Sequence, residues 1–154
     1  MLVANGYFDP SGTPCLKIIL RGALNPQGVE IEAVIDTGFT GFLSIPMLKA
    51  FPVGLPLTGT TPVTYANGVT GYKLTALGVI AVGTRAESGV VILEEGQCDT
   101  LLGMSFLRIF KARLVMTKDN VALLEEDWIE QIQTAAAQQA APPAAQLPPN
   151  QGKS

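Results

Sequence analysis

The stretch Glu32-Ala33-Val34-Ile35-Asp36-Thr37-Gly38-Phe39-Thr40 places an Asp-Thr-Gly turn directly after an apolar strand. A carboxylate at the end of a buried strand is held in a fixed position by that strand. The neighbouring Thr can hydrogen-bond across to a partner, and Gly lets the backbone turn where a side chain would clash. Taken alone, the triplet has a second interpretation, an Asp in a tight turn, because so short a motif also arises by chance.

The composition limits what kind of protein this is. With 154 residues, of which 47% are hydrophobic and 15% charged, the chain is long enough and apolar enough for one domain with a core. The net charge is -3 and the basic residues are scattered, which excludes a nucleic-acid partner. The longest apolar window, 74–82, is too short to span a bilayer, and the N-terminal residues do not form the basic region and apolar stretch that are typical of a secretion signal. We expect a soluble, cytoplasmic protein without a membrane partner.

The residue types that the sequence lacks exclude several kinds of catalytic and metal site. The chain has no His, which removes the usual base of Ser and Cys hydrolases and the usual zinc ligand. Cys15 and Cys98 lie far apart without metal-type or redox-type spacing, and we expect both to be reduced and buried, a disulfide being the less expected alternative. No cofactor and no metal are expected. Hydrolysis, if it occurs, has to depend on carboxylates.

Short apolar runs separated by turn signals predict an all-β domain. Asn67-Gly68 between two such runs predicts a hairpin, because both of these residues tolerate positive φ. A helical turn is expected at 46–51 and a short amphipathic helix at 104–110. The expected strands are 15–21, 29–35, 39–45, 63–66, 69–72, 73–82, 88–93, 111–117 and 121–124.

From Glu125 onward the character of the chain changes. Acidic residues at 125–127 favour a helix N-terminus, and Trp128, Ile129 and Ile132 share one face, so a helix to about residue 140 is expected. An Ala/Gln/Pro-rich segment follows that lacks large apolar residues and is predicted to be a flexible tail. The sequence therefore divides into a β-domain, 1–126, and a short helix with its tail, 127–154.

Three features stand in a fixed order: Asp36-Thr37-Gly38 after a strand, a hairpin at 65–71, and Leu101-Leu102-Gly103 opening a short helix. In this order the sequence resembles the retropepsin-like aspartic proteases, the single-domain relatives of retroviral protease, over about residues 14–124. The resemblance implies a closed β-barrel of the acid-protease type with one short C-terminal helix. It also implies a homodimer that binds protein or peptide substrates.

The resemblance also implies roles for individual residues. Asp36 resembles the catalytic carboxylate, Thr37 the residue whose hydroxyl reaches the other subunit's loop, and Gly38 the turn residue whose amide orients the acid. Leu101, Leu102 and Gly103 resemble the element that supports this loop from beneath. The residues that match the tip of the substrate-covering flap are Ala66, Asn67, Gly68, Val69 and Thr70, with Gly71 as a hinge. The candidates to line substrate pockets are Phe39, Phe42, Val69 and Ile92.

Phe39 departs from the family pattern, which has Ser, Thr or Ala at this position. A small hydroxyl there stabilises the ionised acid and Phe cannot, so we expect a pH optimum nearer neutral than acidic. Two other acidic segments have plainer interpretations. Asp99-Thr100 is interpreted as a turn or capping Asp, and Glu94-Glu95 as a solvated loop that binds no metal.

One Asp-Thr-Gly per chain predicts two chains per active site. Peptide hydrolysis by carboxylates needs a base and an acid, which two adjacent carboxylates sharing one proton supply. A twofold axis between two copies is the simplest way to bring the second one in. The expected activity is that of an aspartic endopeptidase. Two alternatives remain open: a catalytically silent dimer of the same fold that binds peptides or serves assembly, and a monomeric small-ligand β-barrel with an accidental triplet.

Overall fold

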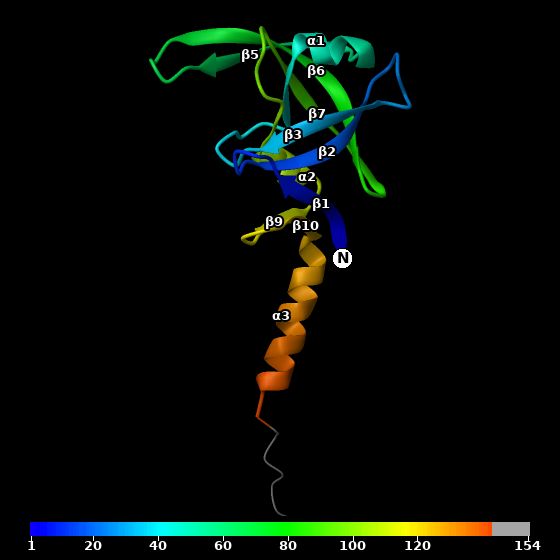
Figure 1. The fold of residues 1–154 in the computed structure, drawn as a ribbon, viewed down its shortest axis with the longest axis vertical. Helices are drawn as coiled ribbons and strands as arrows, with labels where there is room; N and C mark the ends of the chain where they lie inside the picture. Colours follow the sequence, from blue (N-terminus) through cyan, green and yellow to red (C-terminus); the bar gives the residue numbers. More distant parts are fainter. Residues whose placement is uncertain (143–154) are drawn as a thin grey trace, which may run out of the picture.

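Ten β-strands of the described residues form one strongly curved sheet (Figure 1). The computed structural model describes residues 1–142, the side chains of Trp128 and Ile129 excepted. The strands are β1 Leu2–Phe8, β2 Pro14–Arg21, β3 Val29–Ile35, β4 Leu43–Pro46, β5 Leu57–Thr64, β6 Thr70–Val82, β7 Arg85–Glu94, β8 Leu101–Leu102, β9 Ala112–Met116 and β10 Val121–Glu125. The helices are α1 Met47–Ala50, the 3-10 turn η1 Phe51–Val53, α2 Met104–Ile109 and α3 Glu126–Ala140.

The sheet closes on itself into a barrel. Its strand order is β5-β6-β7-β4-β8-β3-β2-β1-β10-β9, and β6 pairs in addition with β2 through Ile19↔Ala81 and its neighbours. Strands β2, β3, β8, β4, β7 and β6 therefore form a ring, which confirms the expected closed all-β architecture. Inside it, Leu16, Ile18 and Leu20 of β2 are buried while Lys17 and Ile19 face outward, because successive strand residues point to opposite faces.

Three aromatic rings fill the end of the core next to α2. Phe106 and Phe110 are fully buried with ring centroids 4.6 Å apart, and the ring of Phe42 lies 6.1 Å from that of Phe106. Phe42 is only 2% exposed. Its proposed place in a substrate pocket is therefore wrong: the side chain turns inward and packs in the core.

Strands β5 and β6 form a long hairpin that extends from the barrel (Figure 1). The hairpin expected around Asn67-Gly68 is confirmed, and one of these two residues adopts positive φ. Among the turn residues Gly68 has positive φ, +80°, and Asn67 does not. The amide of Gly68 donates to the carbonyl of Tyr65 at 2.9 Å, and the amide of Tyr65 donates to the carbonyl of Val69 at 2.9 Å. This is the three-residue loop in which an ordinary turn is followed by one left-handed Gly.

Helix α3 begins directly after β10 and leads away from the barrel (Figure 1). Glu126 and Asp127 occupy its first turn, where acidic side chains stabilise the partial positive charge of the helix N-terminus. Ile132 is 48% exposed. None of the described helices is long and apolar enough to cross a bilayer. The predicted flexible tail lies outside the described residues from 143 onward.

The two cysteines differ in their environments. Cys15 is buried and Cys98 is exposed, and both are free thiols. The expectation that both would be buried is therefore wrong for Cys98. This residue lies in the loop between β7 and β8 and is not part of a strand. Partial desolvation still raises the pKa of both thiols.

Candidate active site

The backbone around Asp36 is fixed by three hydrogen bonds. The amide of Asp36 donates to the carbonyl of Leu102 at 2.9 Å, because β3 runs parallel to β8 and pairs with it up to this point. The amide of Gly38 donates to Oδ1 of Asp36 at 2.9 Å. The amide of Phe39 donates to the carbonyl of Asp36 at 3.1 Å, which closes the turn. Asp36 is half-buried, whereas Thr37 and Gly38 are exposed.

The loop after Asp36 rests on the start of α2. The amide of Met104 donates to the carbonyl of Phe39 at 2.8 Å, and that of Ser105 to the carbonyl of Gly41 at 3.1 Å. These amides belong to the first turn of a helix, where they have no partner within the helix itself. A Cβ on Gly103 would lie 2.3 Å from the carbonyl oxygen of Gly41 and 2.5 Å from that of Phe39. Only Gly allows the loop and the helix to approach this closely.

A cleft of about 520 Å³ opens beside the Asp36 loop. One wall is the loop itself, residues 38–41, and the other is the β5 arm of the hairpin, residues 61–64. Phe39 and Ile92, two of the expected pocket residues, line it, as does Leu101. Sequence reasoning missed the β5 arm, because its run of Thr residues carries no special chemistry.

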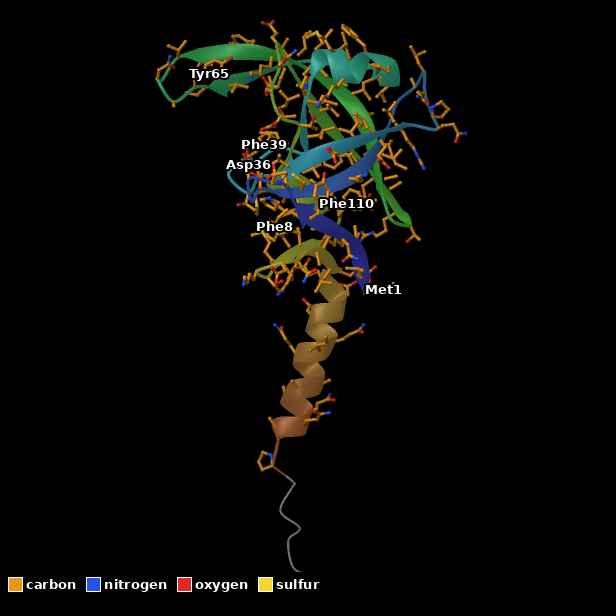
Figure 2. All side chains as sticks on the ribbon, in the orientation of Figure 1. Met1, Phe8, Asp36, Phe39, Tyr65 and Phe110 are labelled. Atoms are coloured by element: carbon orange, nitrogen blue, oxygen red, sulfur yellow. The ribbon has the colours of Figure 1, made fainter. Side chains whose placement is uncertain are left out.

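The expected flap-tip residues do not line this cleft. Residues 66–70 are exposed at the end of the hairpin, and Val69 is 58% exposed. In Figure 2, Tyr65 at that end and Asp36 and Phe39 at the loop lie toward the same side of the barrel. The hairpin end and the acid loop thus share one flank of the molecule, with the cleft beside the loop.

One charged side chain lines the cleft, that of Glu94. Its Oε1 accepts a hydrogen bond from Oγ of Ser44 at 3.0 Å, and its Oε2 forms an ion pair with Nζ of Lys73. The side chains of Glu94 and Lys73 are each 20% exposed. The interpretation of Glu94 as part of a solvated loop is therefore wrong, because β7 continues through it. The signal that could have found the pair is the β6–β7 turn at Gly83-Thr84, which sets a register with Lys73 opposite Glu94.

Asp99 and Thr100 do not line the cleft beside the acid loop. Asp99 is exposed, and the carbonyl of the buried Thr100 accepts a hydrogen bond from the amide of Val34 at 2.8 Å. Within residues 1–142 no group of His, Cys, Asp and Glu side chains is arranged to hold a metal ion.

Comparison with known proteins identifies the fold. No family model matches this chain, and no curated protein matches it. Among solved structures it is similar to a retropepsin-like aspartic protease from Rickettsia conorii, with a TM-score of 0.52 and 20% identity over 77% of this chain and 87% of that one. It is also similar to EIAV protease complexed with the inhibitor HBY-793, with a TM-score of 0.53 and 14% identity over 71% of this chain and 98% of that one. The chain has a retropepsin-like fold.

Proposed function

We propose that this protein is an aspartic endopeptidase that cleaves extended peptide segments as a homodimer, with Asp36 of each subunit in one shared site. The observation that carries the proposal is the hydrogen bond from the amide of Gly38 to Oδ1 of Asp36, on a retropepsin-like fold and beside a cleft. A carboxylate held in this way keeps one oxygen fixed and leaves the other for substrate and water.

The reaction needs two carboxylates that share one proton. Water bound between the two Asp36 side chains attacks the scissile carbonyl carbon and gives its proton to the ionised carboxylate. The protonated carboxylate donates its proton to the carbonyl oxygen. The intermediate then collapses and the C–N bond breaks. The leaving nitrogen takes the proton from the carboxyl group that accepted it from water, and a hydroxyl of the intermediate returns its proton to the other carboxylate, which restores the pair. Thr37, at the exposed side of the turn, is proposed to reach the partner's loop.

The cleft and the hairpin give the proposed substrate its place. An extended peptide lies between residues 38–41 and 61–64, where Phe39 and Ile92 offer apolar contacts. The β5–β6 hairpin acts as the flap, and its tip, residues 66–70, covers the peptide and forms strand-like main-chain hydrogen bonds with it. Leu102 and Gly103 support the acid loop through the contacts described above, and Leu101 pairs with Val34, two residues before the acid.

A degenerate peptide library digested between pH 4 and 8 tests the activity. We expect cleavage by the wild-type chain and its loss, about a thousandfold or more, in Asp36→Asn, which keeps the shape of the side chain and removes its acid-base function. Equal cleavage by both proteins would contradict the proposal. Peptide binding without cleavage by the wild type would favour the silent binding module. Sedimentation over a concentration range tests the dimer, and an active monomer would exclude the shared site.

A further inference from the structure

The flap hairpin leaves the barrel at a defined position. Backbone pairing of β6 with β7 ends at Thr75 and Ile92. Two residues beyond this point on each strand, Lys73 of β6 and Glu94 of β7 are joined by an ion pair between their side chains. The ion pair therefore spans the fork where the hairpin, residues 57–74, separates from the barrel.

Each end of this ion pair has a second contact. On the barrel side, the carboxylate of Glu94 is held by Oγ of Ser44, a β4 residue that is 3% exposed. On the flap side, Nζ of Lys73 lies 5.6 Å from the ring centroid of Tyr65, which begins the turn at the flap tip. A cation at this distance from an aromatic ring is attracted to it. The contacts run from the barrel wall through Glu94 and Lys73 to the flap tip.

The chain of contacts reaches the cleft as well. Glu94 and Ser44 both line it, together with residues 61–64 of the opposite hairpin arm. A shift of Lys73 away from Glu94 would move the β6 arm, and the β5 arm would move with it because the two are paired from Gly59↔Thr75 to Thr64↔Thr70. The wall of the cleft would then change position.

We propose that Lys73 and Glu94 are positioning residues that hold the flap over the cleft, with Ser44 fixing the carboxylate. The role of the flap as a substrate cover rests on the proposed function, whereas the link between hairpin and barrel does not depend on it. Both side chains are mostly shielded from water, so their attraction is screened less than that of an exposed pair. Loss of one partner leaves the other charge partly buried and unpaired.

Hydrogen exchange of the full chain without substrate tests the link directly. In Glu94→Gln and in Lys73→Met we expect the amides of residues 57–74 to exchange about fivefold faster, while those of the barrel strands are unchanged. The double variant should exchange no faster than Lys73→Met, because that single change already removes both the ion pair and the contact of Lys73 with the ring of Tyr65. The matched control is Lys17→Met, which breaks the exposed Lys17–Glu30 pair, 3.4 Å long, on β2 and β3. It should leave the hairpin unchanged.

Cleavage kinetics give a second readout. A flap that is less well held weakens substrate binding before it affects chemistry, so KM should rise about fivefold in both variants with kcat within about twofold. Hairpin exchange equal to wild type in both variants, or an equal effect of Lys17→Met, would overturn the inference even if the protein cleaves peptides. Faster hairpin exchange in a protein that cleaves no peptide would support the link and count against the protease.

Discussion

The amide of Asp36 donates a hydrogen bond to the carbonyl oxygen of Leu102, 2.9 Å away. The bond extends the parallel pairing of β3 with β8 to the acid itself. The carbonyls of the following loop then bind the first amides of α2. The position of the Asp36 carboxylate is thus set by strand β8, by the first turn of α2 and by Gly103 between them. All three are distant from Asp36 in the sequence.

Gly103→Ala should disrupt this arrangement. The added methyl group would meet two backbone oxygens, of Gly41 and Phe39, at 2.3 and 2.5 Å, and neither can rotate away as a side chain could. We expect the free energy of unfolding to fall by about 3 kcal/mol, and the loop to move. Chemical denaturation measures the first effect and amide exchange at residues 36–42 the second.

Gly71→Ala provides the control for that substitution. There the nearest atoms to an added methyl group belong to the ring of Tyr65, 3.0 Å away, and this side chain is 45% exposed and can shift. We expect a change below about 1 kcal/mol. Equal losses at both positions would mean that the close packing at Gly103 has no special effect.

Much of the barrel could be predicted from sequence because its strands alternate between apolar and polar residues or form short apolar runs. Strand β1 was missed for a physical reason. Asn5-Gly6 has the composition of a turn, yet Gly6 lies inside the strand because a Cβ there would meet the carbonyl oxygen of Cys15 at 2.5 Å. Close approach and turn formation both select Gly, and a single sequence does not distinguish them.

The site was predictable only in part. Asp36 and Gly103 could be found because each belongs to a recognisable motif, Asp-Thr-Gly and Leu-Leu-Gly. Phe39 and Phe42 belong to no such motif, and their side chains face opposite ways. Phe39 lines the cleft and Phe42 packs against Phe106. The expected strand over 39–45 begins only at Leu43, and residues 39–42 are irregular, so the alternation of a strand does not apply to the two side chains.

The two phenylalanines should therefore respond differently to substitution. Phe42→Ala should cost about 3–5 kcal/mol of folding free energy because it opens a cavity in the core. Phe39→Leu should cost less than about 1.5 kcal/mol and should change which peptides are cleaved. Thermal unfolding and a library digest measure the two effects. A change in cleavage preference with unchanged stability in Phe42→Ala would contradict the assignment.

Tyr7 should make alkaline stability dependent on its phenol proton. Its hydroxyl donates to Oε1 of Glu32 at 2.6 Å, and this bond, followed by burial and the negative charge of Glu32, raises the pKa of Tyr7 from 10.0 to about 12. The folded state favours the protonated phenol, so this stabilisation is complete below pH 10.0 and is lost as the pH rises through about 12.

Absorbance of the phenolate during an alkaline titration measures this effect. The last tyrosine step of the native protein should disappear in Tyr7→Phe, and in Glu32→Gln the Tyr7 step should move to lower pH because the acceptor's charge is gone. Stability of Tyr7→Phe should also decline less than that of wild type over the same interval. An unaltered last step in Tyr7→Phe would show that another group titrates there.

Mixed dimers provide the sharpest test of the shared site. If both Asp36 carboxylates are needed, a dimer of one wild-type chain and one Asp36→Asn chain has no acid-base pair and is inactive. When equal amounts of the two chains have exchanged partners at random, about one quarter of the dimers are wild type, so activity per total chain should fall to about one quarter. Independent monomers would keep about one half of the activity.

The control is a mixture of wild type with Lys17→Met, a substitution in the exposed Lys17–Glu30 pair. This mixture should be as active as wild type alone. Activity that stays proportional to the amount of wild-type chain would mean that each Asp36 acts without its counterpart, and the proposed twofold site would have to be abandoned.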